Sequence, residues 1–491
     1  MSNVTRRRFL EDSLFAAAAA ATVAGFATGS RSAAAAEAAA DKAASQDKTS
    51  PNDVLQHAIL GCRIRGKAHA AEFGKQTGTR IAYVCDPDLA LAEELAASIE
   101  KANGYKPQVV QDLRRVMDDK KVDTVSIAAP NHWHALAAIW AMQAGKDVYV
   151  EKPVCHNIVE GRRMVDFARD LKKICQGGTQ NRSSGPIKAA ADFVQTGGLG
   201  EVKLARTIIY GQRGSIGPRG TCEIPPKCDL NLWLGPAMVE KIDRPKLHYD
   251  WHWVWDTGNG ELGNNNIHMV DICRIFLPGL TGLGDSVISV GGRVGYEDAG
   301  ETPNTQMTVH RFGETTVVQE VRGLKSKPFS DQFKSGYVIY GSEGFIADAT
   351  LFDPSGKLVR KFEGKGDNHF ANFMAAVRSR KPEDLNAEIL EGHQSTALCH
   401  VSNISYRLGQ KVAAKEIGEA LAAKEYHPDV KQTFDRMLAH LAEAGVDTEK
   451  TQLTLGAALK LSPAFERFVG NPAADALLGR EYRRGFELPK V

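Results

Sequence analysis

The feature that most constrains the fold is an alternation of short apolar strands with helical segments after residue 55. An apolar strand over 58–60 leads into Gly61-Cys62-Arg63-Ile64-Arg65-Gly66, and a helix is predicted over 67–77. A second strand over 81–85 ends on Asp86. Repeated strand–helix units indicate a parallel sheet that binds ligands at the carboxyl ends of its strands. The order strand, glycine turn, helix, strand, acid predicts a dinucleotide-binding Rossmann unit.

The glycine turn departs from the usual G-x-G-x-x-G pattern. Gly61 and Gly66 hold its first and third glycine positions, but Arg63 stands where a second glycine lets the backbone approach the pyrophosphate. Either the turn no longer grips phosphate, or it opens slightly and the guanidinium of Arg63 or Arg65 contacts the anion. Asp86 lies at the distance expected for ribose binding, and its charge repels a 2′-phosphate, so NAD is favoured over NADP.

The strand–helix alternation continues to residue 153. The predicted elements are a helix over 113–118, a strand over 122–129, a loop over 130–133, a helix over 134–144 and a strand over 147–150. Pro130, Asn131 and Glu151-Lys152-Pro153 follow strands, so they are expected at the ligand-binding edge. A lysine beside a cofactor is a good hydrogen-bonding cation for a substrate hydroxyl, and a solvated surface charge is the alternative.

Several motifs resemble the Gfo/Idh/MocA (glucose-fructose oxidoreductase / inositol dehydrogenase) family. They are Ala129-Pro130-Asn131-His132-Trp133-His134, the run 144–153 that ends in Glu151-Lys152-Pro153, and the segments 178–183, 232–236, 258–274 and 372–379. The resemblance covers nearly everything after residue 55. It implies an α/β oxidoreductase in which an N-terminal Rossmann domain with a parallel sheet precedes an α+β domain with an open, mainly antiparallel sheet. It also implies hydride transfer between NAD and a secondary alcohol of a sugar or polyol.

The resemblance implies roles for individual residues. Lys152 would hydrogen-bond the reacting hydroxyl, and His268 would act as acid/base, with Asn264 where the family often has aspartate. Without that carboxylate the imidazolium of His268 is less stabilised, so the site is a weaker base or relies on Asp271. Positions 264, 268 and 271 have the spacing of one helix face.

The remaining candidate residues form two groups. The predicted cofactor-binding residues are Gly61, Arg63, Arg65, Gly66, Asp86, Pro130, Asn131, His134, Glu151 and Gln180. The predicted substrate-binding residues are Arg182, Tyr249, Trp253 and Asp271.

The segment 249–256 holds three of the six tryptophans. Sugars bind against aromatic faces, so a carbohydrate cleft is one interpretation, and a core or a subunit interface is the other. His248 and His252 are four residues apart, but no third ligand accompanies them, so no metal site is predicted.

The sequence pattern predicts three regions after the first fifty residues. We predict the Rossmann domain over 51–180 and a substrate and oligomerisation domain over 181–410. The second domain has strands at 285–291, 304–312, 315–321 and 336–340 and helices within 369–408. A polar, mostly helical extension over 411–491 is expected to dock on its own body or on a neighbouring subunit of a homo-oligomer.

The first fifty residues differ in composition, since 17 of them are alanine. Arg6-Arg7, followed by x-Phe-Leu, resembles a twin-arginine export signal, with residues 14–29 as its apolar region and the small-residue run 33–36 after it. A low-complexity tail is the alternative. The signal predicts recognition by the twin-arginine export machinery and a periplasmic location.

Composition excludes some functions. The 61 Lys+Arg and 59 Asp+Glu residues give a net charge of +2 without a basic stripe, which argues against nucleic acid as a partner. Eight cysteines are no disulfide framework in a chain this long, although Cys222 and Cys228 would either close a small ring or stay as free thiols. Three functions remain: a sugar or polyol dehydrogenase with tightly bound, recycled NAD, a redox-neutral NAD-dependent glycosidase, and a non-catalytic sugar-binding protein.

Overall fold

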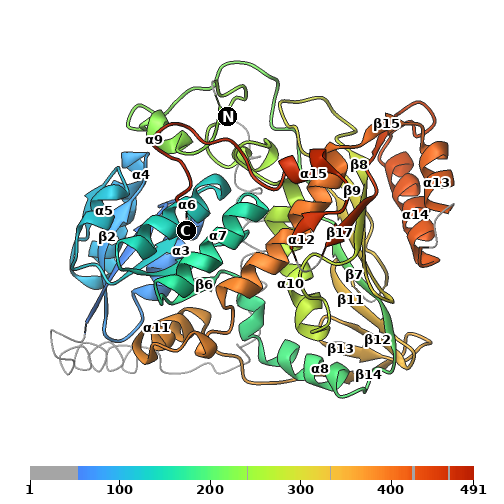
Figure 1. Cartoon of the computed structure of the whole chain (residues 1–491), viewed down its shortest axis with the longest axis horizontal. Helices are drawn as coiled ribbons and strands as arrows, with labels where there is room; N and C mark the ends of the chain where they lie inside the picture. Colours follow the sequence, from blue (N-terminus) through green and yellow to red (C-terminus); the bar gives the residue numbers. More distant parts are fainter. Residues whose placement is uncertain (1–53, 240, 332, 423–425, 463–464, 491) are drawn as a thin grey trace, which may run out of the picture. The chain divides into compact units, whose positions relative to one another are not determined.

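Two β-sheets organise the chain in the computed structural model (Figure 1). The structure describes residues 54–239, 241–331, 333–422, 426–462 and 465–490, and residues 55–491 form one compact unit. The predicted export signal lies outside the described residues. Within the described part, no helix is both long and apolar enough to cross a membrane.

The first sheet is the predicted Rossmann sheet. Its six strands are all parallel, in the order β3-β2-β1-β4-β5-β6, and the switch point lies between β1 and β4. The strands are β1 (Leu55–Leu60), β2 (Thr79–Cys85), β3 (Gln108–Val110), β4 (Thr124–Ile127), β5 (Asp147–Val150) and β6 (Cys175–Gly177). The helices that alternate with them are α3 (Ile64–Phe73), α4 (Leu89–Asn103), α5 (Arg114–Asp118), α6 (Asn131–Gln143) and α7 (Ile158–Asp170). The central strands are buried because helices cover both faces.

Two helices of this domain begin earlier than predicted. Helix α3 begins at Ile64 rather than at 67, directly inside the glycine turn. Helix α6 begins at Asn131, so the predicted loop over 130–133 is wrong after Pro130. Pro130 adopts a φ of −60° at the cap of α6, a geometry that suits the residue entering a helix.

The second sheet has twelve strands and is mainly antiparallel, as predicted. Its main path is β14-β13-β12-β11-β7-β10-β9-β8-β16-β15, and β17 pairs with β8 and β18. Among the described strands of this sheet, only β7 and β10 pair in parallel. The strands are β7 (Val202–Ile209), β8 (Ser286–Gly292), β9 (Thr305–Phe312), β10 (Thr315–Arg322), β11 (Gly336–Gly341), β12 (Gly344–Ala347), β13 (Thr350–Phe352), β14 (Leu358–Lys361), β15 (Gln410–Val412), β16 (Leu453–Leu455), β17 (Leu459–Ser462) and β18 (Arg467–Phe468).

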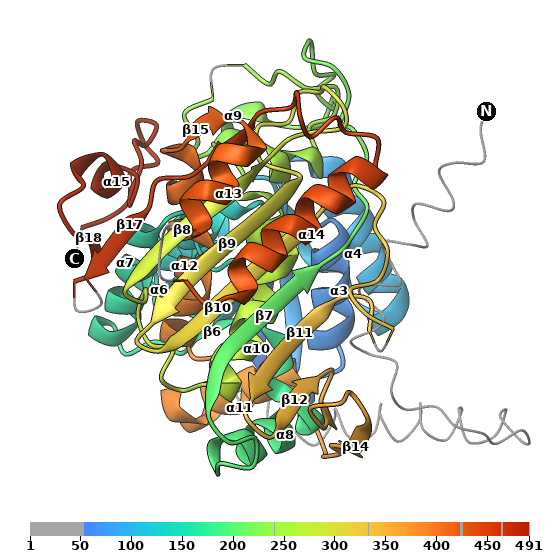
Figure 2. The same ribbon diagram turned by 90° about the vertical axis from the view of Figure 1, so that its right-hand side faces the viewer.

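Helices cover both faces of this sheet. Successive strand residues point to opposite sides, so neighbouring residues of one strand pack against different helices. On one face Ala205 and Val317 pack with α10, and on the other Leu204 and Val318 pack with α14. Figure 2 shows α13 and α14 lying across the strands. The helices of this region are α8 (Gly185–Gln195), α9 (Leu230–Leu234), α10 (Ile267–Phe276), α11 (His369–Ser379), α12 (Ile389–Arg407), α13 (Ala414–Ala422), α14 (Asp429–Glu443) and α15 (Pro472–Ala476).

The C-terminal extension is not only helical. After α13 and α14 it adds β16, β17 and β18, whose short apolar alternation is a strand pattern rather than a helical one. Its last residues return to the first domain, where Phe486 packs edge-on against Trp133, with ring centroids 5.6 Å apart. The extension therefore docks on its own body.

The cysteines are thiols in this structure. All eight are free, including Cys222 and Cys228, which are partly buried. The small ring is not formed.

Candidate functional site

The glycine turn joins β1 to α3 with almost no spare space. Gly61 has a φ of +92°, and a Cβ there would lie 2.6 Å from the backbone of Ala128. A Cβ on Gly66 would lie 1.9 Å from the Gly61 carbonyl oxygen. Both positions therefore require glycine. The exposed Arg63 precedes α3 without a side-chain cap from the described residues, so the first-turn N–H groups suit an anionic ligand such as a pyrophosphate.

Asp86 lies beside this turn at the end of β2. Its carboxylate is 6 % exposed and accepts hydrogen bonds from the backbone N–H groups of Cys62 (2.8 Å) and Asp88 (2.9 Å). Burial raises the pKa of Asp86, although these two bonds oppose the rise. Each carboxylate oxygen accepts more than one bond, so Asp86 is chemically suited to bind nucleotide hydroxyls as well. Together with the open helix terminus, it makes this edge fit a dinucleotide.

Glu151 organises a buried cluster at the end of β5. Arg65 Nη2 lies 2.6 Å from its Oε1, His69 Nε2 lies 3.1 Å from the same atom, and Gln180 Nε2 lies 3.4 Å away. Burial alone would raise the pKa of Glu151, but Arg65 and then His69 hold it well below the usual value. Arg65 is thus engaged by Glu151, and Arg63 is the arginine of the turn that remains exposed.

Asn131 and His134 fasten α6 to neighbouring segments. Asn131 Nδ2 donates to Asn259 Oδ1 of the second domain at 3.0 Å. The ring nitrogens of His134 lie 2.6 Å from the Pro153 carbonyl oxygen and 2.7 Å from that of Ala129. These contacts hold the ends of β4 and β5, where Pro130 and Lys152 lie, in one place.

Lys152 reaches from the Rossmann domain to the second domain. Its Nζ donates to the main-chain oxygen of Asn264 at 2.5 Å and lies 3.5 Å from Asn264 Oδ1. Burial is the main cause that lowers the pKa of Lys152 to about 8. The structure therefore brings together Lys152 and Asn264, two of the three residues predicted to be catalytic.

His268 lies one helical turn beyond Asn264, on α10. Burial and the nearby charge of Lys152 lower the pKa of His268 to about 3, so its ring is neutral at neutral pH. Its Nδ1 is buried and has no hydrogen-bond partner among the described residues. Asn264 belongs to a π-helical turn, η4 (Leu262–Asn266), whose wider winding changes the simple i, i+4, i+7 face that the spacing predicted.

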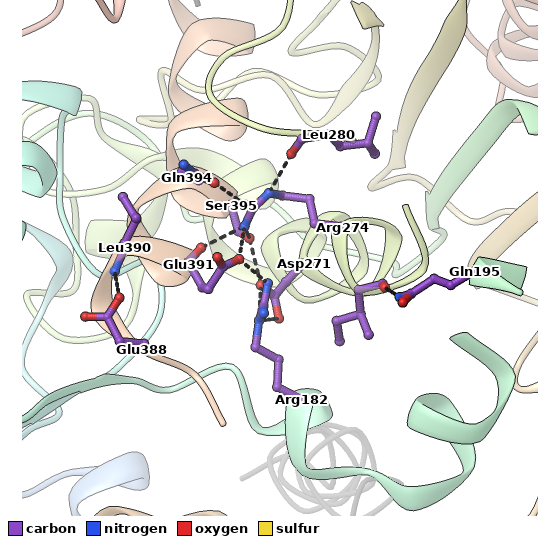
Figure 3. A network of polar contacts seen from close by, with 11 residues as sticks. Arg182, Gln195, Asp271, Arg274, Leu280, Glu388, Leu390, Glu391, Gln394 and Ser395 are labelled. Atoms are coloured by element: carbon purple, nitrogen blue, oxygen red, sulfur yellow. Dashed lines mark hydrogen bonds and ion pairs between the residues drawn. The ribbon is translucent and has the colours of Figure 1, made fainter. Parts of the chain in front are cut away.

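Arg182 and Asp271 form a buried ion pair instead of facing an open site (Figure 3). Asp271 is 0 % exposed, and its carboxylate accepts from Arg182 Nε at 2.8 and 3.0 Å and from Ser395 Oγ at 2.7 Å. Arg182 also bonds Glu391 at 3.1 Å. In this arrangement the oxygens of Asp271 are enclosed by protein donors, and its contact with substrate or with His268 stays a prediction.

The residues of the aromatic segment 249–256 have different surroundings in the structure. Trp253, in the short helix η3 (Asp250–Trp253), lines a small hollow together with Arg213, Glu261 and Arg293. Tyr249 precedes η3 with a φ of +69°, a strained value for a bulky residue, and its hydroxyl accepts from Arg213 at 3.3 Å.

The two histidines in and just before this segment, His248 and His252, are engaged by other groups. His248 pairs with Asp88 at 3.0 Å, and His252 stacks on Trp251. No group of three or more His, Cys, Asp or Glu side chains in the described part is placed to hold a metal ion.

Sequence reasoning missed Glu261 and Arg213. Arg213 Nη2 lies 3.0 Å from Glu261 Oε1, and Asn264 Nδ2 donates to Glu261 Oε2 at 3.4 Å. The one sequence feature that could have indicated Glu261 is its place as an acidic residue three positions before Asn264. Its partner Arg213 lies 48 residues away in the chain, so spacing does not connect the two.

Two family models match the chain in the places that the fold indicates. Residues 55–179 match the model described as "Oxidoreductase family, NAD-binding Rossmann fold". Residues 218–436 match the model described as "Oxidoreductase family, C-terminal alpha/beta domain". Both models belong to Gfo/Idh/MocA, and between them they cover most of the described chain.

Individual relatives agree with this assignment. A glycosyl hydrolase family 109 protein of Shewanella sp. (strain W3-18-1) is 31 % identical over 185 residues, which cover 36 % of this chain and 39 % of that protein. The match therefore spans about two fifths of the length of that relative. Levoglucosan dehydrogenase of Pseudarthrobacter phenanthrenivorans is 25 % identical over 318 residues, covering 60 % of this chain and 73 % of that protein.

A solved structure shares the fold. The WlbA dehydrogenase from Bordetella pertussis, in complex with NADH and UDP-GlcNAcA, aligns with a TM-score of 0.52 and 17 % identity, over 70 % of this chain and 94 % of that one. The two matched domain models, in the same order as the two sheets, show that the chain belongs to the Gfo/Idh/MocA oxidoreductase family, with its NAD-binding Rossmann domain followed by the C-terminal α/β domain.

Proposed function

We propose that the protein is an NAD-dependent oxidoreductase that acts on a secondary alcohol of a sugar, polyol or glycoside. The observation that carries this proposal is the placement of Lys152 at the end of β5, where its amine meets the turn that leads to His268. A partly buried amine and a neutral imidazole can supply the hydrogen-bond donor and the base that removal of a hydroxyl proton needs. The similarity to levoglucosan dehydrogenase supports the substrate class.

The residues divide the chemistry between them. NAD, when bound, supplies the hydride acceptor. The neutral ring of His268 is able to accept the hydroxyl proton through a ring nitrogen. Protonated Lys152 donates a hydrogen bond to the oxygen and stabilises the developing alkoxide. Asp86 and the first turn of α3 would hold the ribose and the pyrophosphate of the cofactor.

The pH dependence of activity follows from these two groups. The lowered pKa of His268, about 3, keeps its ring neutral at all higher pH values, and Lys152 stays protonated until pH rises through about 8. We expect kcat/KM to be nearly constant between about pH 5 and pH 7 and to fall above about pH 8. A steady-state pH profile measures this. An acidic limb centred near the ordinary histidine pKa would contradict the assignment of a neutral His268.

The cofactor is proposed to stay bound and to be recycled within the site. NAD is scarce outside the cytoplasm, so an exported enzyme has to retain it. Purified protein is expected to release NAD or NADH on denaturation, detected by mass spectrometry. Added sugars are then expected to change the nicotinamide absorbance. Protein that contains no nucleotide and binds NAD more weakly than about 100 μM would instead indicate a non-catalytic sugar-binding protein.

A redox-neutral glycosidase is the second candidate, favoured by the similarity to glycosyl hydrolase family 109 proteins. In that reaction, oxidation at a sugar carbon acidifies the neighbouring C–H, and loss of this proton expels the protonated leaving group of the glycosidic bond. Water then adds to the resulting double bond, and return of the hydride to the carbonyl carbon restores the sugar. Chromogenic glycosides distinguish the candidates. Cleavage without net change in nicotinamide absorbance supports the glycosidase, and net reduction of NAD without cleavage supports the dehydrogenase.

Export through the twin-arginine machinery is proposed from Arg6-Arg7 and the alanine-rich segment after them. Replacing both arginines with lysine keeps the positive charge but removes the arginine pair that the export receptor recognises. We expect the double variant to remain in the cytoplasm while the unmodified chain reaches the periplasm. Cell fractionation and immunoblotting measure the distribution. Equal periplasmic amounts of both proteins would contradict the proposal.

A further inference from the structure

The main-chain oxygen that binds Lys152 belongs to an unusual turn. Residues Leu262–Asn266 form the π-helical turn η4 at the start of α10, and the Ile267 N–H bonds the Leu262 carbonyl five residues back. A π-helical turn is a rare departure from α-helical winding, and such turns are frequent at functional sites. Here the turn presents the Asn264 carbonyl to Lys152 Nζ at 2.5 Å.

The side chain of Glu261 supports this turn from its first end. Glu261 is only 3 % exposed. It is the residue that precedes η4, but its carboxylate accepts no capping hydrogen bond from the backbone N–H groups of that turn. Its oxygens accept instead from Arg213 (3.0 and 3.3 Å), from Asn264 Nδ2 (3.4 Å) and from Asn265 Nδ2. One buried carboxylate therefore ties two successive asparagines of the turn to an arginine from a distant segment.

We propose that Glu261 is a positioning residue for Lys152. Its hydrogen bonds to Asn264 and Asn265 hold the turn so that the Asn264 carbonyl faces the amine, and its negative charge helps to keep the amine protonated. Glu261 touches neither substrate nor cofactor in this role. The catalytic consequence rests on the proposed function, whereas the effect on the amine of Lys152 does not.

The charges around Lys152 explain why one carboxylate matters. The charged or titratable groups that face the amine are Glu151, Glu261, Arg65, Arg213, His134, His252 and His268. Burial lowers the pKa of all three histidines, so they are neutral near pH 7. Two carboxylates then balance two guanidiniums. Removing the charge of Glu261 leaves an excess of positive charge, which disfavours protonated Lys152.

The test is Glu261→Gln, read by the titration of Lys152 itself. Competitive acylation with acetic anhydride across pH 6 to 10, followed by peptide mass spectrometry, reports the protonation of this lysine without requiring catalysis. We expect a midpoint near 8 in the unmodified protein and a midpoint lower by about one pH unit in the variant. An unchanged midpoint would overturn the proposal.

The matched control is Glu320→Gln. Glu320 is equally buried, pairs with Arg206 at 2.5 Å and accepts from Tyr210 at 2.9 Å, but it is not among the main charges that act on Lys152. The control is expected to lose stability while Lys152 titrates as in the unmodified protein. A shift of the same size in both variants would show a general effect of lost stability and would overturn the proposal.

A second variant separates charge from position. Glu261→Asp keeps the charge but shortens the side chain, so the Lys152 midpoint is expected to stay near that of the unmodified protein. With an active enzyme, kcat is expected to fall about 10- to 100-fold with little change in KM, because the turn is no longer held in place. An unchanged kcat would overturn the positioning role. An inactive unmodified protein with the expected acylation shifts would instead contradict only the proposed function.

Discussion

Replacing Lys152 with methionine is expected to lower kcat/KM about 10²- to 10⁴-fold, the range that a positioned acid–base group contributes. Methionine has a similar length and tolerates burial, but it provides no hydrogen bond to a substrate oxygen or to the Asn264 carbonyl. Retention of NAD is expected to be unchanged, because Lys152 is assigned to the reacting hydroxyl and not to the nucleotide. Steady-state kinetics and nucleotide release after denaturation measure the two effects.

A second lysine of the Rossmann domain, which is fully buried, serves as the control for this substitution. Lys146 is 1 % exposed, and its Nζ donates to the carbonyl oxygens of Asp119 (2.7 Å) and Val122 (3.1 Å). Lys146→Met removes a comparable buried amine from the same domain, at the start of β5 rather than its end. It is expected to lower stability while kcat of the folded fraction stays the same. Equal losses of kcat in the two variants would refute a catalytic role for Lys152.

Replacing Asp271 with alanine is expected to destabilise the protein by about 3 kcal/mol, the lower end of the cost of removing one partner of a buried ion pair. The variant takes the buried carboxylate away from Arg182, which keeps the 39 % exposed Glu391 as a partner, and it removes the acceptor of Ser395. Figure 3 shows that these groups join α10 to α12, so their loss loosens the packing that carries His268. Urea denaturation followed by circular dichroism measures the change.

A surface ion pair provides the comparison for Asp271. Asp367 pairs with Lys188 at 3.2 Å, but both side chains are largely exposed, at 60 % and 40 %. Water screens such a pair, so Asp367→Ala is expected to shift the denaturation midpoint very little. Similar midpoints for the two variants would show that the Asp271 network contributes no more than a surface contact.

Local pattern was sufficient for the Rossmann half. The strand over 147–150 appears as β5 with the predicted bounds, because a short apolar run before a turn indicates a buried strand by itself. The first residues of α3 and α6 were not predicted correctly, because where these helices begin depends on contacts with other segments of the chain. Gly66 packs on Gly61, and Asn131 binds Asn259 of the other domain.

The local sequence pattern did not predict which residues pair with the buried charged side chains. Spacing placed Asp271 beside His268 on one helix, yet its carboxylate pairs with Arg182, which lies 89 residues away. In one interpretation of the glycine turn, Arg63 or Arg65 contacts the anion, and the structure shows that Arg65 pairs with Glu151, 86 residues away. Spacing along one element shows which residues are neighbours on that element, but it does not show which residue of another element reaches them.

The sequence by itself determined the order of the elements, the glycine turn, the acid after β2 and the lysine after β5, because each depends on neighbours within a few residues. Only the tertiary structure decided that Glu261 supports the turn that meets Lys152, that Asp271 is enclosed by donors, and that the C-terminal extension covers its own sheet. A buried charge has to be paired, and its partner comes from whichever distant segment the fold brings within about 3 Å.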